Sequence, residues 1–217
     1  MTKNDSQLQA DVIEELGFDP TVDATQIGVG AKDGVITLTG TVDSYPEKLA
    51  AERAAKRVAG VHGIAEELKI DVPATHQRAD ADIARAAVLA LEWNTMVPKN
   101  KVTVKVENGW LTLEGELDWS YQRDAARRAV EHLVGLHGVT NSINIKSTAF
   151  SGDVRAEIRK AFGRAAEIDA NKVQVEINNG VVTLRGDVHS WNERDEASVA
   201  ALSVPGIKVV NNLTHVI

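Results

Sequence analysis

Residues 33–40 read DGVITLTG, and two later stretches repeat the pattern: NGWLTLEG at 108–115 and NGVVTLRG at 179–186. Asp-Gly and Asn-Gly pairs tolerate positive φ at both central positions of a type I′ turn, which joins antiparallel strands. The apolar residues that follow alternate with threonine, as expected for a strand with one buried face. We therefore expect each stretch to form a tight hairpin. The turn motif comprises Asp33, Gly34, Gly40, Asn108, Gly109, Gly115, Asn179, Gly180 and Gly186.

The three stretches lie 75 and 71 residues apart, and the sequence around them aligns at the same offsets. Corresponding positions include Leu8, Ile83 and Val154 before the motif, and Gly60, Gly135 and Gly206 after it. Repetition at a fixed period is the signature of tandem structural units. We expect three domains, at residues 1–72, 79–147 and 150–217, with a linker at 73–78.

Each unit is predicted to have the order α-β-β-α-β. An amphipathic helix opens the unit, with apolar residues at i, i+4 and i+8, as at Val154, Ile158 and Phe162. A strand, the hairpin and a second strand follow. The second helix has an alanine-rich stripe that allows close approach to the sheet, and a short third strand is expected around 67–71, 142–146 and 212–216. The predicted fold class is α+β, with three modules, each a three-stranded mixed sheet with two helices on one face.

This element order, together with the [DN]-G-x-[VIL]-T-L-x-G hairpin, resembles the BON domain, named for bacterial osmotically inducible and nodulation proteins. A later glycine and apolar residue before the last strand fit the same family, at Gly60-Val61, Gly135-Leu136 and Gly206-Ile207. The resemblance covers nearly the whole chain, as three tandem copies. It implies non-enzymatic binding modules of the kind found in stress and envelope proteins, which are proposed to bind phospholipid or to hold a protein near an envelope.

Composition narrows the function classes. The chain has 24 basic and 31 acidic residues, a net charge of −7, and no cysteine. An acidic chain is a poor candidate for general nucleic-acid binding. Without cysteine there are no disulfides, thiolate metal sites or cysteine nucleophiles. The histidines lack metal-binding spacing and no nucleophile elbow is present, so we expect no catalytic residue, metal or cofactor.

The N-terminal residues are polar, and no window approaches 18 consecutive apolar residues. The sequence therefore predicts neither a signal peptide nor a transmembrane helix. We expect a cytoplasmic protein, or a periplasmic one if a leader was removed.

Aromatic residues make up only 4% of the chain, so their positions are informative. Tyr45, Trp119 with Tyr121, and Trp191 each fall between the second strand and the second helix of their copy. Two interpretations remain open. These side chains contact a lipid interface or a partner, or they form a hydrophobic staple or pack between neighbouring copies.

Two further tryptophans in the second copy are expected in different surroundings. Strand alternation places Trp110 on the sheet face that carries no helix, over the hairpin or at a contact between copies. Trp93, at the end of the first helix, is expected in the core.

A basic cluster in the second copy completes the candidate site. Arg123, Arg127 and Arg128 follow Trp119 and Tyr121, in the copy where residues 73–147 carry 9 basic and 9 acidic residues. Arginines beside interfacial aromatics suit a lipid headgroup, although they also suit a solvated helix face. The leading hypothesis is a stress-related binding or scaffold protein that contacts anionic phospholipid at or near a membrane, and does not bind nucleic acid. The alternative is a protein–protein or self-assembly module, including a homo-oligomer.

Overall fold

The computed structural model describes residues 3–146, 154–164, 172–178, 181–188, 191–204 and 208–215. Module 1 contains α1 (Asp5–Phe18), the short 3₁₀ helix η1 (Ala24–Gln26), β1 (Ile27–Lys32), β2 (Val35–Val42), α2 (Tyr45–Arg57) and β3 (Gly63–Ile70). Module 2 contains α3 (Asp80–Trp93), β4 (Val102–Glu107), β5 (Trp110–Leu117), α4 (Ser120–Val130) and β6 (Gly138–Ile145). Module 3 contains α5 (Val154–Phe162), β7 (Val173–Asn178), β8 (Val181–Val188), α6 (Trp191–Leu202) and β9 (Lys208–His215).

Each module is a three-stranded sheet in which the hairpin strands are antiparallel and the second and third strands are parallel, so the predicted fold class is confirmed. The third strands begin four residues earlier than expected, at Gly63, Gly138 and Lys208. The reason is that parallel pairing continues back to the start of the second strand, as in the pair Val35 and Gly63. These residues are extended by backbone pairing, which side-chain alternation does not reveal.

The two glycines of the hairpin motif are required for different reasons, one in the turn and one within the second strand. Asp33 and Gly34 have φ of 51° and 76°, as a type I′ turn requires. At the end of the motif, Gly40 has φ of 114°, and a Cβ there would overlap the carbonyl oxygen of Gln26. Gly115 and Gly186 face the equivalent carbonyls of Lys101 and Lys172, and Asn108 and Gly109 repeat the turn. Asn179 and Gly180 lie outside the described residues.

The core of each module lies between the sheet and its helix pair. Ile36 and Leu38 of β2, which sequence alternation directs inward, are fully buried, as are Ala51, Ala54 and Ala55 of α2. Alanines at these positions let α2 lie close to the sheet.

Two tryptophans of module 2 lie on the surface. The expectation that Trp93 is a core residue is wrong, because its side chain is 84% exposed. It comes two residues after the buried Leu91, and two residues turn a helix by about 200°. Trp110 lies on the helix-free sheet face as expected, where its Nε1 donates to Thr140 Oγ1 at 2.8 Å and its ring covers Gly138.

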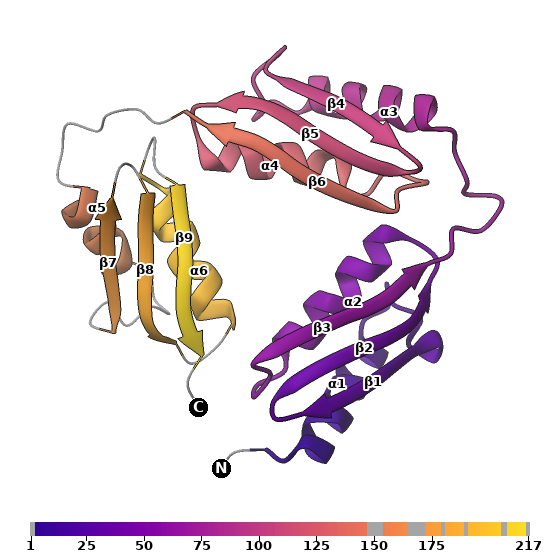
Figure 1. Cartoon of the computed structure of the whole chain (residues 1–217), viewed down its shortest axis with the longest axis horizontal. Helices are drawn as coiled ribbons and strands as arrows, with labels where there is room; N and C mark the ends of the chain where they lie inside the picture. Colours follow the sequence, from indigo (N-terminus) through magenta and orange to yellow (C-terminus); the bar gives the residue numbers. More distant parts are fainter. Residues whose placement is uncertain are drawn as a thin grey trace.

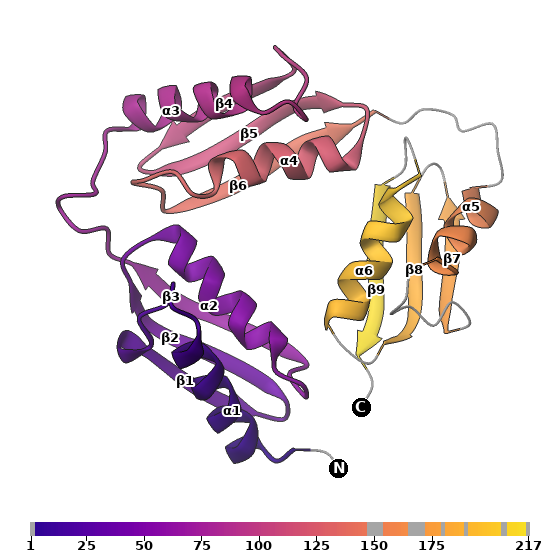
Figure 2. The ribbon, with the colours of Figure 1, turned by 180° about the vertical axis from the view of Figure 1, so that it is seen from behind.

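The three modules form a triangle, and in both views all helices lie on one side of the molecule and all sheets on the other (Figures 1 and 2). We call these sides the helix face and the sheet face. Within the described residues, none of the helices is long and apolar enough to cross a membrane.

Candidate functional site

Two of the aromatic residues at the starts of the second helices pack between modules. Tyr45 and Leu49 of α2 are each 9% exposed and belong to the same continuous cluster of buried side chains as the core of module 2. Trp191 of α6 is half-buried, and its Nε1 donates to the carbonyl oxygen of Val61 in module 1 at 2.8 Å. The Lys56 ammonium lies 5.5 Å from the Trp191 ring centroid. These aromatics therefore join module 1 to both of its neighbours.

The equivalent residues of module 2 are more open. Trp119 is half-buried and Tyr121 is 51% exposed, with their ring centroids 6.1 Å apart. The backbone N–H of Trp119 donates to Gln122 Oε1 at 3.2 Å, which closes the first turn of α4. Tyr121, in that first turn, is left with about half of its side chain in solvent.

The structure does not gather the three arginines of α4 into one patch. Arg123 borders β6, since its carbonyl oxygen accepts from Asn141 Nδ2 at 2.9 Å, and its guanidinium lies 3.4 Å from Asp124. Arg127, one turn further, pairs with Glu131 at 3.4 Å. Both cations are thus already engaged with carboxylates.

Arg128 lies on the other side of α4, toward α3. It follows Tyr121 by two turns, and Ala125 between them accepts from Asn94 Nδ2 at 3.5 Å through its carbonyl oxygen. Arg128 is exposed and makes no ion pair within the described residues. Tyr121 and Arg128 therefore border the end of α3.

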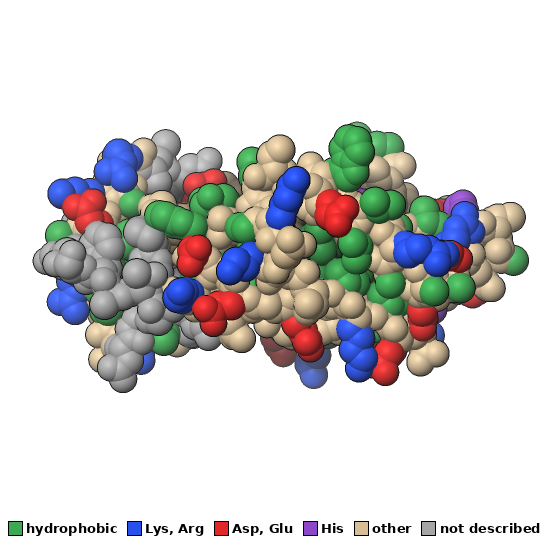
Figure 3. All heavy atoms as spheres, turned by 90° about the horizontal axis from the view of Figure 1, so that it is seen from above, with side chains coloured by type: hydrophobic (Ala, Val, Ile, Leu, Met, Phe, Trp, Pro, Cys, Tyr) green, Lys and Arg blue, Asp and Glu red, His purple; other side chains and the backbone are tan. Residues whose placement is uncertain are grey.

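An exposed apolar surface on α3 was not identified from the sequence. Leu89, Trp93 and Met96 are 55%, 84% and 56% exposed. Leu89 and Trp93 each come two residues after a core position of α3, which directs them away from the sheet and onto the helix face. In the view from above, hydrophobic side chains gather near the middle of the molecule among charged ones (Figure 3).

The same offset recurs in module 1. Phe18 follows the buried Leu16 by two residues and is 77% exposed. Phe18 and Trp93 are 75 residues apart, so they occupy the same position in their repeats. The position of Phe18 and Trp93 two residues after the buried i, i+4 series is the sequence signal that could have identified them as exposed residues.

We define the module 2 patch as Leu89, Trp93, Met96, Tyr121 and Arg128. Asn94 follows Trp93 directly and contacts α4 at Ala125, so the apolar end of α3 and the exposed edge of α4 adjoin. The patch combines large apolar side chains with an aromatic hydroxyl and a cation that makes no ion pair among the described residues. Such a surface is suited to bind a partner surface in which a charged outer layer covers an apolar layer.

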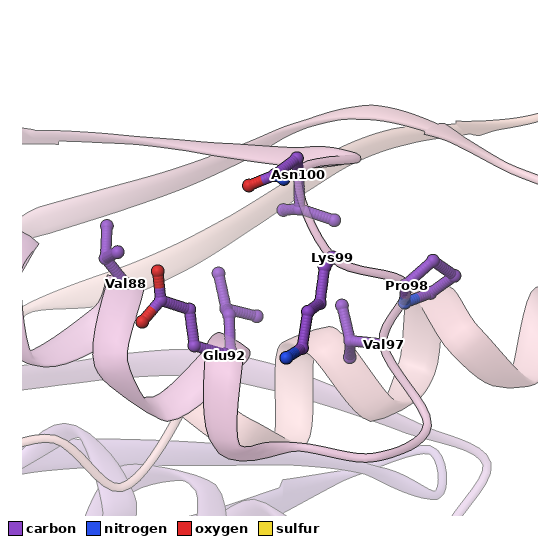
Figure 4. A pocket seen from close by; sticks show the side chains of 8 residues that line it. Val88, Glu92, Val97, Pro98, Lys99 and Asn100 are labelled. Carbon is purple, nitrogen blue, oxygen red and sulfur yellow. The ribbon is translucent and has the colours of Figure 1, made fainter.

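A small cavity of about 70 Å³ lies beside this patch, between the end of α3 and the loop into β4 (Figure 4). Val88, Val97 and Pro98 form its apolar walls, while Glu92 and Lys99 supply charges of opposite sign. This volume is well below the several hundred Å³ of a typical small-molecule site. A larger hollow of about 630 Å³ adjoins it, lined by Trp93, Asn94 and Thr95, and is wide open to solvent. The two form a depression in the surface beside the module 2 patch, not an enclosed pocket.

The described residues contain no group of three or more His, Asp or Glu side chains arranged to hold a metal ion. His137 is exposed, and its Nδ1 lies 2.8 Å from the carbonyl oxygen of Asn108, to which it donates. Its ring also lies against Gly109. This histidine supports the hairpin.

Comparison with known proteins agrees with the repeat architecture. The model of the BON domain matches residues 4–71, 79–147 and 151–217. Osmotically-inducible protein Y of Escherichia coli (strain K12) is 26% identical over 147 residues, which cover 66% of this chain and 73% of that protein.

Among solved structures, two of CdsD, a structural protein of the type III secretion system of Chlamydia trachomatis, are similar to this chain. The first is 16% identical with a TM-score of 0.28 and covers 95% of this chain and 91% of the CdsD chain. The second, of the C-terminal domain, is 15% identical with a TM-score of 0.26 and covers 99% of this chain and 100% of the CdsD chain.

Proposed function

Because the chain belongs to the BON-domain family in all three of its modules, we propose that it is a non-enzymatic binding protein that contacts a phospholipid surface through the module 2 patch. The family supports a binding role, and the likeness to an osmotically inducible protein supports a role in stress. Module 1 acts as a scaffold beside the contact.

The observation that carries this proposal is the exposure of Trp93, at 84%, beside Leu89 and Met96. Large apolar side chains that adjoin on a surface mark an interaction site, because leaving them in water is unfavourable. Tryptophan is especially suited to the boundary between lipid headgroups and acyl chains.

Cations that make no ion pair near the patch supply the second attraction. Lys99 and Lys101 follow Met96 in the loop into β4, and Arg128 lies on α4; all three are exposed, without an ion pair within the described residues. Lysine and arginine near an anionic leaflet each contribute roughly 1 kcal/mol at physiological ionic strength. The patch is therefore matched to anionic headgroups more than to zwitterionic ones.

The test is vesicle flotation of the full chain with anionic (phosphatidylglycerol-containing) and purely zwitterionic vesicles. Trp93→Ala should abolish flotation with anionic vesicles. Phe18→Ala is the matched control, because Phe18 has the same repeat position and a similar exposure. Its module is acidic, with 7 basic and 13 acidic residues in 1–72, so this change should leave flotation intact. Equal loss in both variants, or none in either, would contradict the assignment to module 2.

Two further arms separate the alternatives. Arg123→Glu with Arg127→Glu tests whether the β6 side of α4 also contributes; we expect a smaller loss because both arginines already pair with carboxylates. If the wild-type chain floats with neither vesicle, the module 2 patch is a protein-binding or self-assembly surface instead, and light scattering across concentrations distinguishes those two.

A further inference from the structure

The first helices of the three modules have the same place in the fold but different outer chemistry. α1 carries four acidic and no basic residues, and α3 carries three acidic residues and one basic residue together with the exposed apolar side chains of the module 2 patch. Residues 154–164, which contain α5, carry four basic residues and one acidic residue. Since the buried positions are apolar in all three, this divergence is confined to the outer surfaces.

The basic residues of this segment are available for binding. Arg155, Arg159, Lys160 and Arg164 are all exposed. Lys160 pairs with Glu157 at 2.8 Å, in a pair whose two side chains are 65% and 45% exposed. Exposed pairs of this kind are weak and compete poorly with a dense array of headgroup charges.

The arrangement of the modules places α5 on the same side as the module 2 patch. The helices of modules 2 and 3 both lie on the helix face (Figure 2). Val199 of α6 adds an apolar side chain to that face of module 3, 64% exposed and two residues after the buried Ala197. A flat surface that meets the module 2 patch can therefore also meet module 3.

We infer that α5 is a second, electrostatic contact with the same anionic lipid surface, formed by Arg155, Arg159, Lys160 and Arg164. This inference rests on the proposed function. The module 2 patch supplies apolar insertion and α5 supplies charge, so that the two together bind more tightly than either alone. The ligand is the anionic face of a bilayer, not a soluble phosphate.

The first experiment reverses charge on α5. Arg159→Glu with Lys160→Glu should weaken binding to phosphatidylglycerol vesicles at low salt by about ten-fold or more. Lys105→Glu with Arg185→Glu makes the same change in net charge on exposed sheet-face residues and should leave binding within about two-fold. Arg159→Gln with Lys160→Gln, with a smaller loss, repeats the test if the glutamates disturb folding. Soluble inositol phosphate should not displace the protein from the vesicles.

The second experiment locates the contact. The chain has no cysteine, so an environment-sensitive fluorophore can be placed at one engineered cysteine at a time. A label at Val199 on the helix face should shift to the blue on vesicle binding, whereas a label at Gln174 on the sheet face should not.

The outcomes separate the two proposals. The proposed function stands if the wild type binds vesicles and Trp93→Ala abolishes that binding. The α5 contact is overturned if Arg159→Glu with Lys160→Glu binds as well as its sheet-face control, or if the Val199 label does not shift. Displacement by soluble inositol phosphate overturns the assignment of α5 to a bilayer. If the wild type binds no vesicle, both fail.

Discussion

The indole Nε1 of Trp191 donates a hydrogen bond of 2.8 Å to the carbonyl oxygen of Val61, across 130 residues of chain. Together with Lys56, which lies 5.5 Å from the ring centroid, this contact holds module 3 against module 1. One hydrogen bond and one partly buried cation–π pair contribute about 1.5 to 2 kcal/mol in total. This contact therefore makes a modest contribution to holding module 3 against module 1, and we call the state in which it is broken the open state.

Trp191→Ala should raise the open population roughly ten-fold or more. Energy transfer between fluorophores on cysteines introduced at Glu14 and Asn212, both exposed, should fall in this variant. Trp110→Ala removes an indole from the sheet face of module 2 and should leave the transfer unchanged. Unaltered transfer in Trp191→Ala would mean that other contacts hold modules 1 and 3 together.

The contact between modules 1 and 2 is of a different kind, because Tyr45 and Leu49 share a buried cluster with the core of module 2. Leu49→Ala should lower the unfolding free energy of module 2 by about 2 kcal/mol, although Leu49 belongs to module 1. In a Trp191→Phe background every remaining tryptophan lies in module 2, so its fluorescence reports that module during urea unfolding.

Leu8→Ala is the control for this prediction. Leu8 is also buried in a helix of module 1, but it belongs to a core cluster that contains residues of module 1 alone. It should destabilise module 1 and change the tryptophan-detected transition much less than Leu49→Ala does. Equal shifts would show that modules 1 and 2 unfold as one unit whatever the site of damage.

The sequence was a reliable guide wherever a local pattern determines local structure. The hairpins follow from Asp-Gly and Asn-Gly pairs, and the inward side of β2 follows from alternation at Ile36 and Leu38. Repetition of these signals at 75 and 71 residues was enough to predict three modules of the same fold.

The candidate site was less predictable, because it depends on relations that local patterns do not contain. Trp93 was assigned to the core by its hydrophobicity, although its offset from Leu91 directs it outward. Trp191 and Val61 lie 130 residues apart, and nothing in a single sequence indicates that two such distant residues are in contact. The sequence places Arg123 and Arg128 close together, but five residues turn a helix by about 140°, so the two side chains leave α4 on different sides.

A carboxylate in module 1 predicts a dependence of stability on acidic pH. The hydroxyl of Thr21 donates to Asp19 Oδ1 at 2.6 Å, and the backbone N–H of Thr21 donates to the same oxygen at 3.1 Å. These two bonds, with a smaller contribution from Arg57, lower the pKa of Asp19 from its ordinary 3.8. A pKa that is lower in the folded state stabilises the protein above the unfolded value, and this stabilisation is lost as pH falls through the folded pKa.

Asp19→Asn should therefore lower the stability of module 1 at pH 6, and the difference from wild type should shrink below about pH 3.8. Thermal unfolding of both proteins between pH 6 and pH 3 measures this. A difference that stays constant to pH 3 would show that the carboxylate charge does not contribute.

The last prediction concerns the carboxylate that holds the hairpin of module 2. Asp80 at the start of α3 accepts from the backbone N–H groups of Asn108 and Gly109, each at 2.8 Å. Asp5 makes the same pair of contacts with Asp33 and Gly34 in module 1, at 3.1 and 3.4 Å. Because hydrogen bonds to a charged group are stronger than neutral ones, Asp80→Ala should cost about 2 kcal/mol.

Asp82→Ala provides the matched comparison, two residues along the same helix. Asp82 pairs with Arg85 on the surface, with the side chains 51% and 73% exposed, and such pairs contribute little. Its removal should change the urea midpoint by an amount equivalent to less than about 0.5 kcal/mol. If the two variants are equally stable, the bonds from Asp80 to the hairpin contribute no more than an exposed ion pair, and the turn residues alone hold the strands in register.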